Sequence, residues 1–181
     1  MILYLDTNVI LARYSRGEHA YDASKRLIRY IETGNAEAVT SILTLVEVVS
    51  ATSRAYERHR DKSTQMKRDE IAGAFLKKIT ELSNLNFIPI GGDVSLNIGE
   101  KTLKIPAIFA VAIETGSKTG LKTLDNIHIA SASIASRIYS KKIDHFVTLD
   151  EDILKHREEI MAVTGIMAAA PDEILLEGPA R

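Results

Sequence analysis

Short apolar runs that end on an acidic residue set the pattern of this chain. Ile2–Leu5 is a continuous run rich in strand-forming residues, which predicts a buried strand, and it ends on Asp6. A second, mostly apolar run at 144–149 ends in the same way on Asp150. The other predicted strands lie at 37–42, 86–90 and 162–168.

Segments with helical spacing separate these runs. After Asp6, apolar residues at such spacing continue until Gly17. The same pattern predicts helices at 20–33, 43–58, 71–82 and 124–139, helical pieces in 94–115 that break near Pro106, a short helix after Asp150 and a last one from Pro171. No compact hairpin signal interrupts this alternation, which therefore predicts an α/β fold with a mostly parallel sheet.

The composition is that of an ordinary globular domain. The 181 residues are 45% hydrophobic and 26% charged, which is enough for the core of one domain. The absence of cysteine excludes disulfides, thiolate metal sites and cysteine nucleophiles. A net charge of −1 argues against a protein that coats a polyanion. No apolar run approaches the ~20 residues of a membrane span, and no basic leader precedes the first run, so we expect a cytoplasmic protein without membrane association.

Four acids stand in apolar surroundings: Asp6, Glu47, Asp125 and Asp150. Parallel strands would place Asp6 and Asp150 at the same edge of the sheet, and the other two lie near predicted helix starts that could reach it. Simpler roles stay open. Asp6 and Asp150 could cap the helices that follow them, Asp125 could complement a helix dipole, and Glu47 could face solvent.

Four carboxylates at one edge would repel one another unless a cation neutralised them. Because oxygen ligands suit hard ions, such a cluster could hold Mg²⁺ or Mn²⁺ and activate a water against a phosphate. Capping explains each acid singly but explains the combination poorly. The sequence therefore predicts a divalent-cation site at the carboxyl edge of the sheet.

At these residues the sequence resembles the PIN-domain family of metal-dependent ribonucleases, which includes VapC-type toxins. The matching segments are Tyr-Leu-Asp6-Thr-Asn-Val-Ile, Leu-Thr-Leu-Val-Glu47-Val, Leu-Asp125-Asn-Ile-His-Ile-Ala-Ser-Ala and Phe-Val-Thr148-Leu-Asp150. The resemblance implies a three-layer α/β sandwich with a mostly parallel central sheet. It also implies one PIN-like domain over 1–181, with the surplus length forming a helical elaboration around 54–113.

The resemblance implies a chemistry as well. Asp6, Glu47, Asp125 and Asp150 would be the catalytic and metal-binding residues of a Mg²⁺- or Mn²⁺-dependent ribonuclease in which a metal-activated water hydrolyses the phosphodiester. Three other residues would support the site, namely Asn8, Thr148 and Asp152, the last of which could replace or assist Asp150. The implied partners are an RNA substrate, an antitoxin protein and a second copy of the chain.

Two other functions stay open. A PIN-like module could bind RNA or protein without cutting. A hydrolase with an aspartyl nucleophile, similar to the haloacid dehalogenase family, would also begin with a strand that ends in Asp, but such enzymes commonly place a second Asp where this chain has Asn8. His128, three positions after Asp125, is expected to pack in the core, because the acids already satisfy a hard metal.

Overall fold

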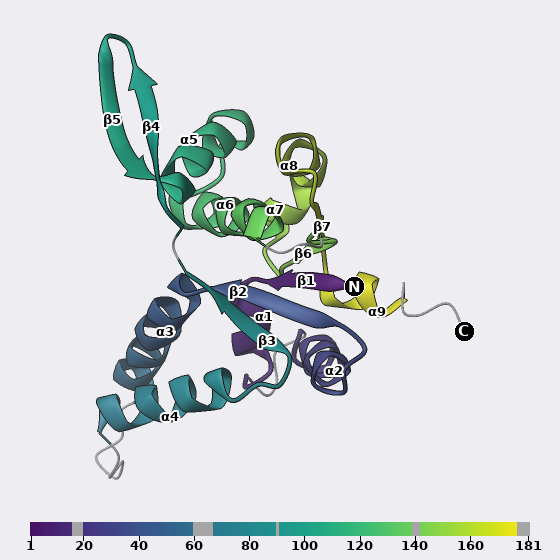
Figure 1. The fold of residues 1–181 in the computed structure, drawn as a ribbon. Helices are drawn as coiled ribbons and strands as arrows, with labels where there is room; N and C mark the ends of the chain where they lie inside the picture. The colour runs from purple at the N-terminus through teal and green to yellow at the C-terminus, as the bar shows by residue number, and fades with distance from the viewer. Residues whose placement is uncertain (16–19, 60–66, 90, 139–141, 177–181) are drawn as a thin grey trace.

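The strand β1 (Ile2–Leu5) lies at the centre of a parallel sheet (Figure 1). The computed structural model describes residues 1–15, 20–59, 67–89, 91–138 and 142–176. Within them, the other strands of this sheet are β2 (Glu37–Ser41), β3 (Leu85–Ile88), β6 (His145–Val147) and β7 (Met167–Ala169). The strands follow the order β3-β2-β1-β6-β7, and every pairing is parallel, which confirms the predicted α/β fold.

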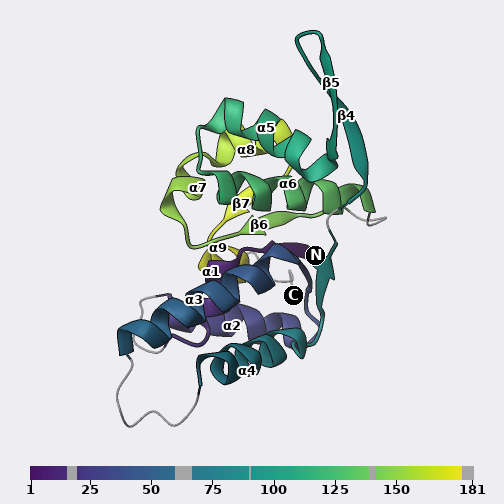
Figure 2. The ribbon, with the colours of Figure 1, turned by 90° about the vertical axis from the view of Figure 1, so that its left-hand side faces the viewer.

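Helices cover both faces of the sheet and complete a three-layer sandwich (Figures 1 and 2). One face carries α1 (Thr7–Ala12), α2 (Tyr21–Glu32), α3 (Leu43–His59), α4 (Arg68–Thr80) and α9 (Pro171–Leu176). The other carries α6 (Thr123–Ile138), α7 (Glu151–Lys155) and α8 (Arg157–Thr164), with α5 (Ala107–Thr119) packed against α6.

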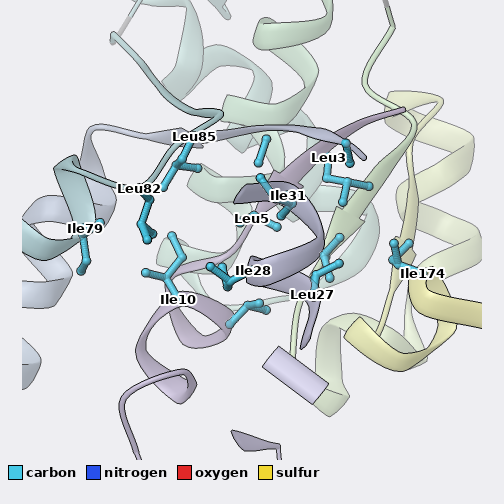
Figure 3. Packing of buried hydrophobic residues seen from close by; sticks show 14 of the residues in the cluster. Leu3, Leu5, Ile10, Leu27, Ile28, Ile31, Ile79, Leu82, Leu85 and Ile174 are labelled. Atoms are coloured by element: carbon cyan, nitrogen blue, oxygen red, sulfur yellow. The ribbon is translucent and has the colours of Figure 1, made fainter. Parts of the chain in front are cut away.

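Alternate side chains of β1 enter two separate cores, as the period of a strand requires. Leu3 and Leu5 pack with α2 residues such as Leu27 and Ile31 in one core (Figure 3). Ile2 and Tyr4 belong to the core on the α6 side. A strand buried on both faces explains why the sequence shows a continuous apolar run there rather than an alternating one.

The prediction of helical pieces in 94–115, broken near Pro106, was wrong for residues 94–106 and right for those after Pro106. Residues 93–106 form an antiparallel hairpin, β4 (Asp93–Ile98) and β5 (Lys101–Pro106), and only then does α5 begin. The apolar residues in this segment alternate with period two, and Gly99 opens the turn with a φ of +58°. Since β3 also falls inside 54–113 and belongs to the central sheet, this segment is not a purely helical elaboration.

Some predicted boundaries also moved. The last strand was predicted at 162–168, but α8 extends to Thr164 and ends at Gly165, whose φ is +70°, so β7 starts only at Met167. Four other predictions fall on residues that the structure does not describe. They are the helix break at Gly17, the helix end at Tyr139, residue 90 of a predicted strand and residues 60–66 of the predicted elaboration. Among the residues that are described, no helix has the length and apolar character needed to cross a membrane.

Candidate active site

Asp6 follows β1 at the carboxyl edge of the sheet, where α1 begins. Although it occupies the N-cap position of α1, its side chain makes no capping hydrogen bond, so the capping role considered for it is wrong. Its Oδ2 instead accepts hydrogen bonds from the Thr148 hydroxyl and the Asn8 amide, each at 2.7 Å. With only 7% of its surface exposed, Asp6 is a buried acid held in place by neutral donors.

Asn8 and Thr148 connect the end of β1 to the loop after β6. The Asn8 Nδ2 donates to Thr148 Oγ1 at 3.1 Å, while its Oδ1 accepts from the Leu149 N–H at 3.0 Å. Thr148 Oγ1 in turn accepts from the Asp150 N–H at 3.0 Å. Two of the three residues predicted to support the site, Asn8 and Thr148, therefore lie beside Asp6 and fix it relative to the segment that carries Asp150.

Glu47 projects from α3 and is held by donors from two other elements. The Thr7 hydroxyl at the start of α1 donates to Glu47 Oε2, and His128 Nε2 on α6 lies 2.7 Å from the same oxygen. Because a carboxylate only accepts hydrogen bonds, Nε2 carries a proton. In the neutral imidazole, Nδ1 then accepts from the Tyr4 hydroxyl, 2.9 Å away. This chain of contacts runs from β1 through His128 of α6 to α3.

Asp125 lies in the first turn of α6 and is half-buried. Asp150 is also half-buried, and it caps α7, because its Oδ1 accepts from the N–H groups of Asp152 and Ile153 at 2.8 and 3.4 Å. The capping role considered for Asp150 is therefore real. Asp152, by contrast, is exposed and lies 3.6 Å from the Lys155 ammonium.

The acids influence one another electrostatically. Burial raises the pKa of Asp6, and the charge of Glu47 raises it further, against the opposing effects of His128 and Thr148. Burial also raises the pKa of Asp125, and the charges of Asp150 and Asp6 add to that increase. These like-charge effects show that Asp6, Asp125 and Asp150 share one electrostatic environment.

Glu47 and His128 stabilise each other's charged forms, unlike the acids above, which disfavour one another's ionisation. Burial disfavours the ionised form of Glu47, but the hydrogen bonds from His128 and Thr7 outweigh it and lower its pKa. Burial likewise disfavours the charged form of His128, yet the bond to Glu47 and the charge of Asp6 outweigh it and raise its pKa. Glu47 is thus kept ionised at an edge where its neighbours resist ionisation.

The donor set suits a hard divalent cation, which would relieve the repulsion that raises the pKa values of Asp6 and Asp125. The acids do not form a closed cage, however. In the part of the chain that the structure describes, no group of three or more His, Asp and Glu side chains converges tightly enough to hold a metal ion. Asp6, Glu47 and Asp150 each accept hydrogen bonds from protein donors instead.

Sequence reasoning missed the residues that hold Glu47. His128 was assigned to core packing, and it is indeed only 2% exposed, but its ring also connects Tyr4 to the carboxylate. Thr7 was not singled out. The available signal was the spacing of three between Asp125 and His128, which places both on one face of α6.

Comparison with known proteins is consistent with this geometry. No curated protein matches the chain significantly. A sequence model of the PIN domain matches residues 3–159, a span that contains Asp6, Glu47, Asp125 and Asp150. Since the match covers most of the chain and the fold is an α/β sandwich around a parallel sheet, the protein belongs to the PIN-domain family, whose members are generally metal-dependent nucleases.

Proposed function

We propose that this protein is a Mg²⁺- or Mn²⁺-dependent endoribonuclease that hydrolyses RNA phosphodiester bonds. The observation that carries the proposal is the buried Asp6, which Thr148 and Asn8 hold at the carboxyl edge of the parallel sheet, near enough to Asp125 for its charge and that of Asp150 to raise the pKa of Asp125. Open α/β sheets bind their ligands at this edge. Like charges held near one another at a partly buried edge are costly to fold, which favours a functional role over a purely structural one.

The metal ligands in this proposal are Asp6, Glu47, Asp125 and Asp150. A bound divalent cation supplies an activated water and neutralises charge on the phosphate. Thr148 and Asn8 hold Asp6 in a fixed orientation, and His128 and Thr7 keep Glu47 ionised as an acceptor. For the fourth acid we favour Asp150 over Asp152, because Asp150 is half-buried and acts on Asp125, whereas Asp152 is exposed beside Lys155.

The test compares cleavage of one sequence supplied as single-stranded RNA, double-stranded RNA and single-stranded DNA. We expect Mg²⁺- or Mn²⁺-dependent cleavage of RNA that EDTA abolishes. Asp6→Asn and Asp125→Asn should each reduce the rate by about 100-fold or more, since loss of even an outer partner of a metal site costs 10- to 100-fold. Asp152→Asn is the matched control and should retain activity.

Three outcomes would contradict the proposal. Metal-dependent cleavage that survived both Asp6→Asn and Asp125→Asn would place the chemistry elsewhere. Calorimetry that detected no divalent-ion binding at millimolar metal would favour the alternative, a PIN-like module that binds RNA or protein without cutting. Trapping of a phosphoaspartate would instead indicate an aspartyl nucleophile.

The resemblance to VapC-type toxins extends the proposal to a toxin held by an antitoxin protein. Expression of the wild-type chain, but not of Asp6→Asn, should then arrest growth of the host cell. A protein encoded by the neighbouring reading frame should relieve the arrest when co-expressed. Growth that was unaffected at comparable protein levels would rule out the toxin role while leaving the nuclease proposal standing.

A further inference from the structure

The hairpin β4–β5 projects from the body of the protein as a two-stranded ribbon (Figures 1 and 2). Its pairing places Val94 opposite Ile105 and Leu96 opposite Leu103, so these four side chains share one face with Ile98 near the tip. That face is therefore almost wholly apolar.

The opposite face of the ribbon is polar, and its side chains interact with one another. Thr102 donates a hydrogen bond to Asn97 at 2.8 Å, and the Lys104 ammonium lies 3.8 Å from Asp93. The two faces therefore differ sharply in chemistry. Water can hydrogen-bond to the polar face. Contact of the apolar face with water is unfavourable, so covering that face with another apolar surface lowers the free energy.

The apolar face is partly covered near its base, where Leu96 and Ile105 are half-buried and Val94 is 39% exposed. There Val94 and Leu96 line a groove against α5 together with Val111 and Ile113. Towards the tip, Ile98 is 55% exposed and Leu103 is 44% exposed. A two-stranded ribbon is marginally stable in water unless a third element supports it, so this length of exposed apolar ribbon indicates a binding surface.

The same chain carries an apolar groove beside the ribbon. It has a volume of about 370 Å³, lies between α5 and the start of α6, and is lined by residues that include Phe109, Ile113, Leu121 and Ile127. Ile113 also lines the groove at the base of the hairpin, which makes the apolar surface continuous from ribbon to helix. Phe109 and Ile113 are 42% and 55% exposed.

We infer that this surface binds a second copy of the chain, with the apolar face of each hairpin lying in the α5/α6 groove of its partner. A projecting arm and a receptive groove on one molecule are self-complementary under two-fold symmetry. The inference gives the homodimerisation expected from the family resemblance a defined surface, and it does not depend on nuclease activity.

Area and charge both favour a second copy over nucleic acid. The exposed parts of the apolar side chains on ribbon and groove amount to roughly 500 Å² per copy, so burying them in both copies reaches the lower limit of about 1,000 Å² for a specific interface. The groove at the hairpin base carries Glu114, which is paired with Lys118 at 2.9 Å, and Arg137, so charges of both signs border the apolar surface and two identical surfaces can meet. An RNA-binding face would instead require a concentration of basic residues, and on this face of the ribbon Lys101 stands alone.

The first experiment measures the mass of the protein in solution by light scattering at about 1 to 100 µM. We expect the wild type to have about twice the chain mass of 20.0 kDa. The double variant Ile98→Asp/Leu103→Asp should fall to the monomer mass. The matched control, Ser95→Asp/Asn97→Asp, places two charges on the polar face of the same ribbon and should remain dimeric. Thermal unfolding would verify that both variants fold.

The second experiment tests the arm-in-groove arrangement. Because the chain has no cysteine, an introduced thiol reports only its own contacts. A mixture of Ile98→Cys and Phe109→Cys chains should form disulfide-linked heterodimers under mild oxidation, whereas Ile98→Cys alone should not cross-link. A monomeric wild type, or a dimer that persists in the apolar-face variant, would overturn the inference. Efficient cross-linking of Ile98→Cys to itself would overturn the arm-in-groove arrangement. None of these readouts depends on RNA cleavage.

Discussion

At the scale of single residues, Asp6 combines burial with a charge that its surroundings disfavour. Thr148 and Asn8 stabilise the carboxylate, yet burial and the nearby charge of Glu47 still raise its pKa. A raised pKa means that the folded state prefers the protonated form. Asp6 therefore contributes stability at acidic pH and loses that contribution as pH rises through the folded-state pKa.

The first prediction concerns the free-energy cost of keeping the buried Asp6 carboxylate ionised. In EDTA at pH 7, Asp6→Asn should be more stable than the wild type by about 1 kcal/mol, because the variant removes an ionised group that is buried among like charges. The difference should vanish as pH falls towards the unfolded-state pKa of about 4, where the wild-type side chain is also neutral. Urea denaturation at pH 4 and pH 7 measures both values. Equal destabilisation of the variant at the two pH values would contradict this account.

Glu47 shows the reverse behaviour, since the hydrogen bonds from His128 and Thr7 lower its pKa. His128 is 81 positions away and is itself held by Tyr4 on the central strand. The ring of Tyr4 stacks on Phe146 with centroids 5.1 Å apart, so removal of the hydroxyl leaves its packing intact.

The second prediction isolates that hydroxyl. Tyr4→Phe should weaken Mn²⁺ binding by about 10-fold, as is typical when an outer partner of a ligand is lost, while the fold is retained. Tyr14→Phe is the matched control, because Tyr14 packs edge to face on Phe75 in the other core. Calorimetric titration at fixed pH compares the two. Equal Mn²⁺ affinities for both variants and the wild type would show that Tyr4 does not position Glu47.

At the scale of secondary-structure elements, the close contact of α5 with α6 controls the first turn of α6. Gly116 of α5 faces Asn126, which is buried. The side-chain amide of Asn126 donates hydrogen bonds to the backbone carbonyls of Leu121 and Lys122 at 2.7 and 3.1 Å. A Cβ at position 116 would lie 3.3 Å from Asn126 Nδ2. The neighbour of Asn126 in the sequence is Asp125, so this packing supports one of the candidate acids.

The third prediction compares two helical glycines. Gly73→Ala in α4 should stabilise the protein by about 0.5–1 kcal/mol, because alanine is the better helix former and nothing lies within 4 Å of the new Cβ. Gly116→Ala offers the same gain but should destabilise by about 1 kcal/mol, since the tightly bonded Asn126 resists displacement. Urea denaturation of both variants tests the sign. A stabilised Gly116→Ala would mean that the α5–α6 contact can relax.

At the scale of the whole molecule, the central sheet was easier to predict from the sequence than the β4–β5 hairpin. Strands such as β1 are buried on both faces, so their apolar runs, and the acids that end them, were visible without any structure. The hairpin was missed because its apolar residues alternate over only six residues in each strand and most of them remain exposed, so the segment was assigned to helical pieces.

The support of the candidate site was harder to predict for a related reason. Thr148, which donates to Asp6, and His128, which contacts Glu47, lie 142 and 81 positions from the acids that they hold, so only the fold brings these pairs together. Local pattern carries no information about such pairings. Asp150 was difficult for a different reason. An Asp that caps a helix and an Asp that could bind a metal look identical in the sequence, and Asp150 caps α7.

The central position of β1 also sets when the site can exist during synthesis. On one side β1 pairs with β2, which follows soon after it, so that half of the sheet can assemble early. Its other neighbour is β6, and the bond between Asp6 and Thr148 joins residues 142 positions apart. Until the ribosome has made β6, Asp6 has neither its hydroxyl donor nor Asp150 nearby. A nascent chain with only β1 and β2 folded would therefore lack both the hydroxyl donor of Asp6 and Asp150, so the candidate site can assemble only after residues 145–150 have been made.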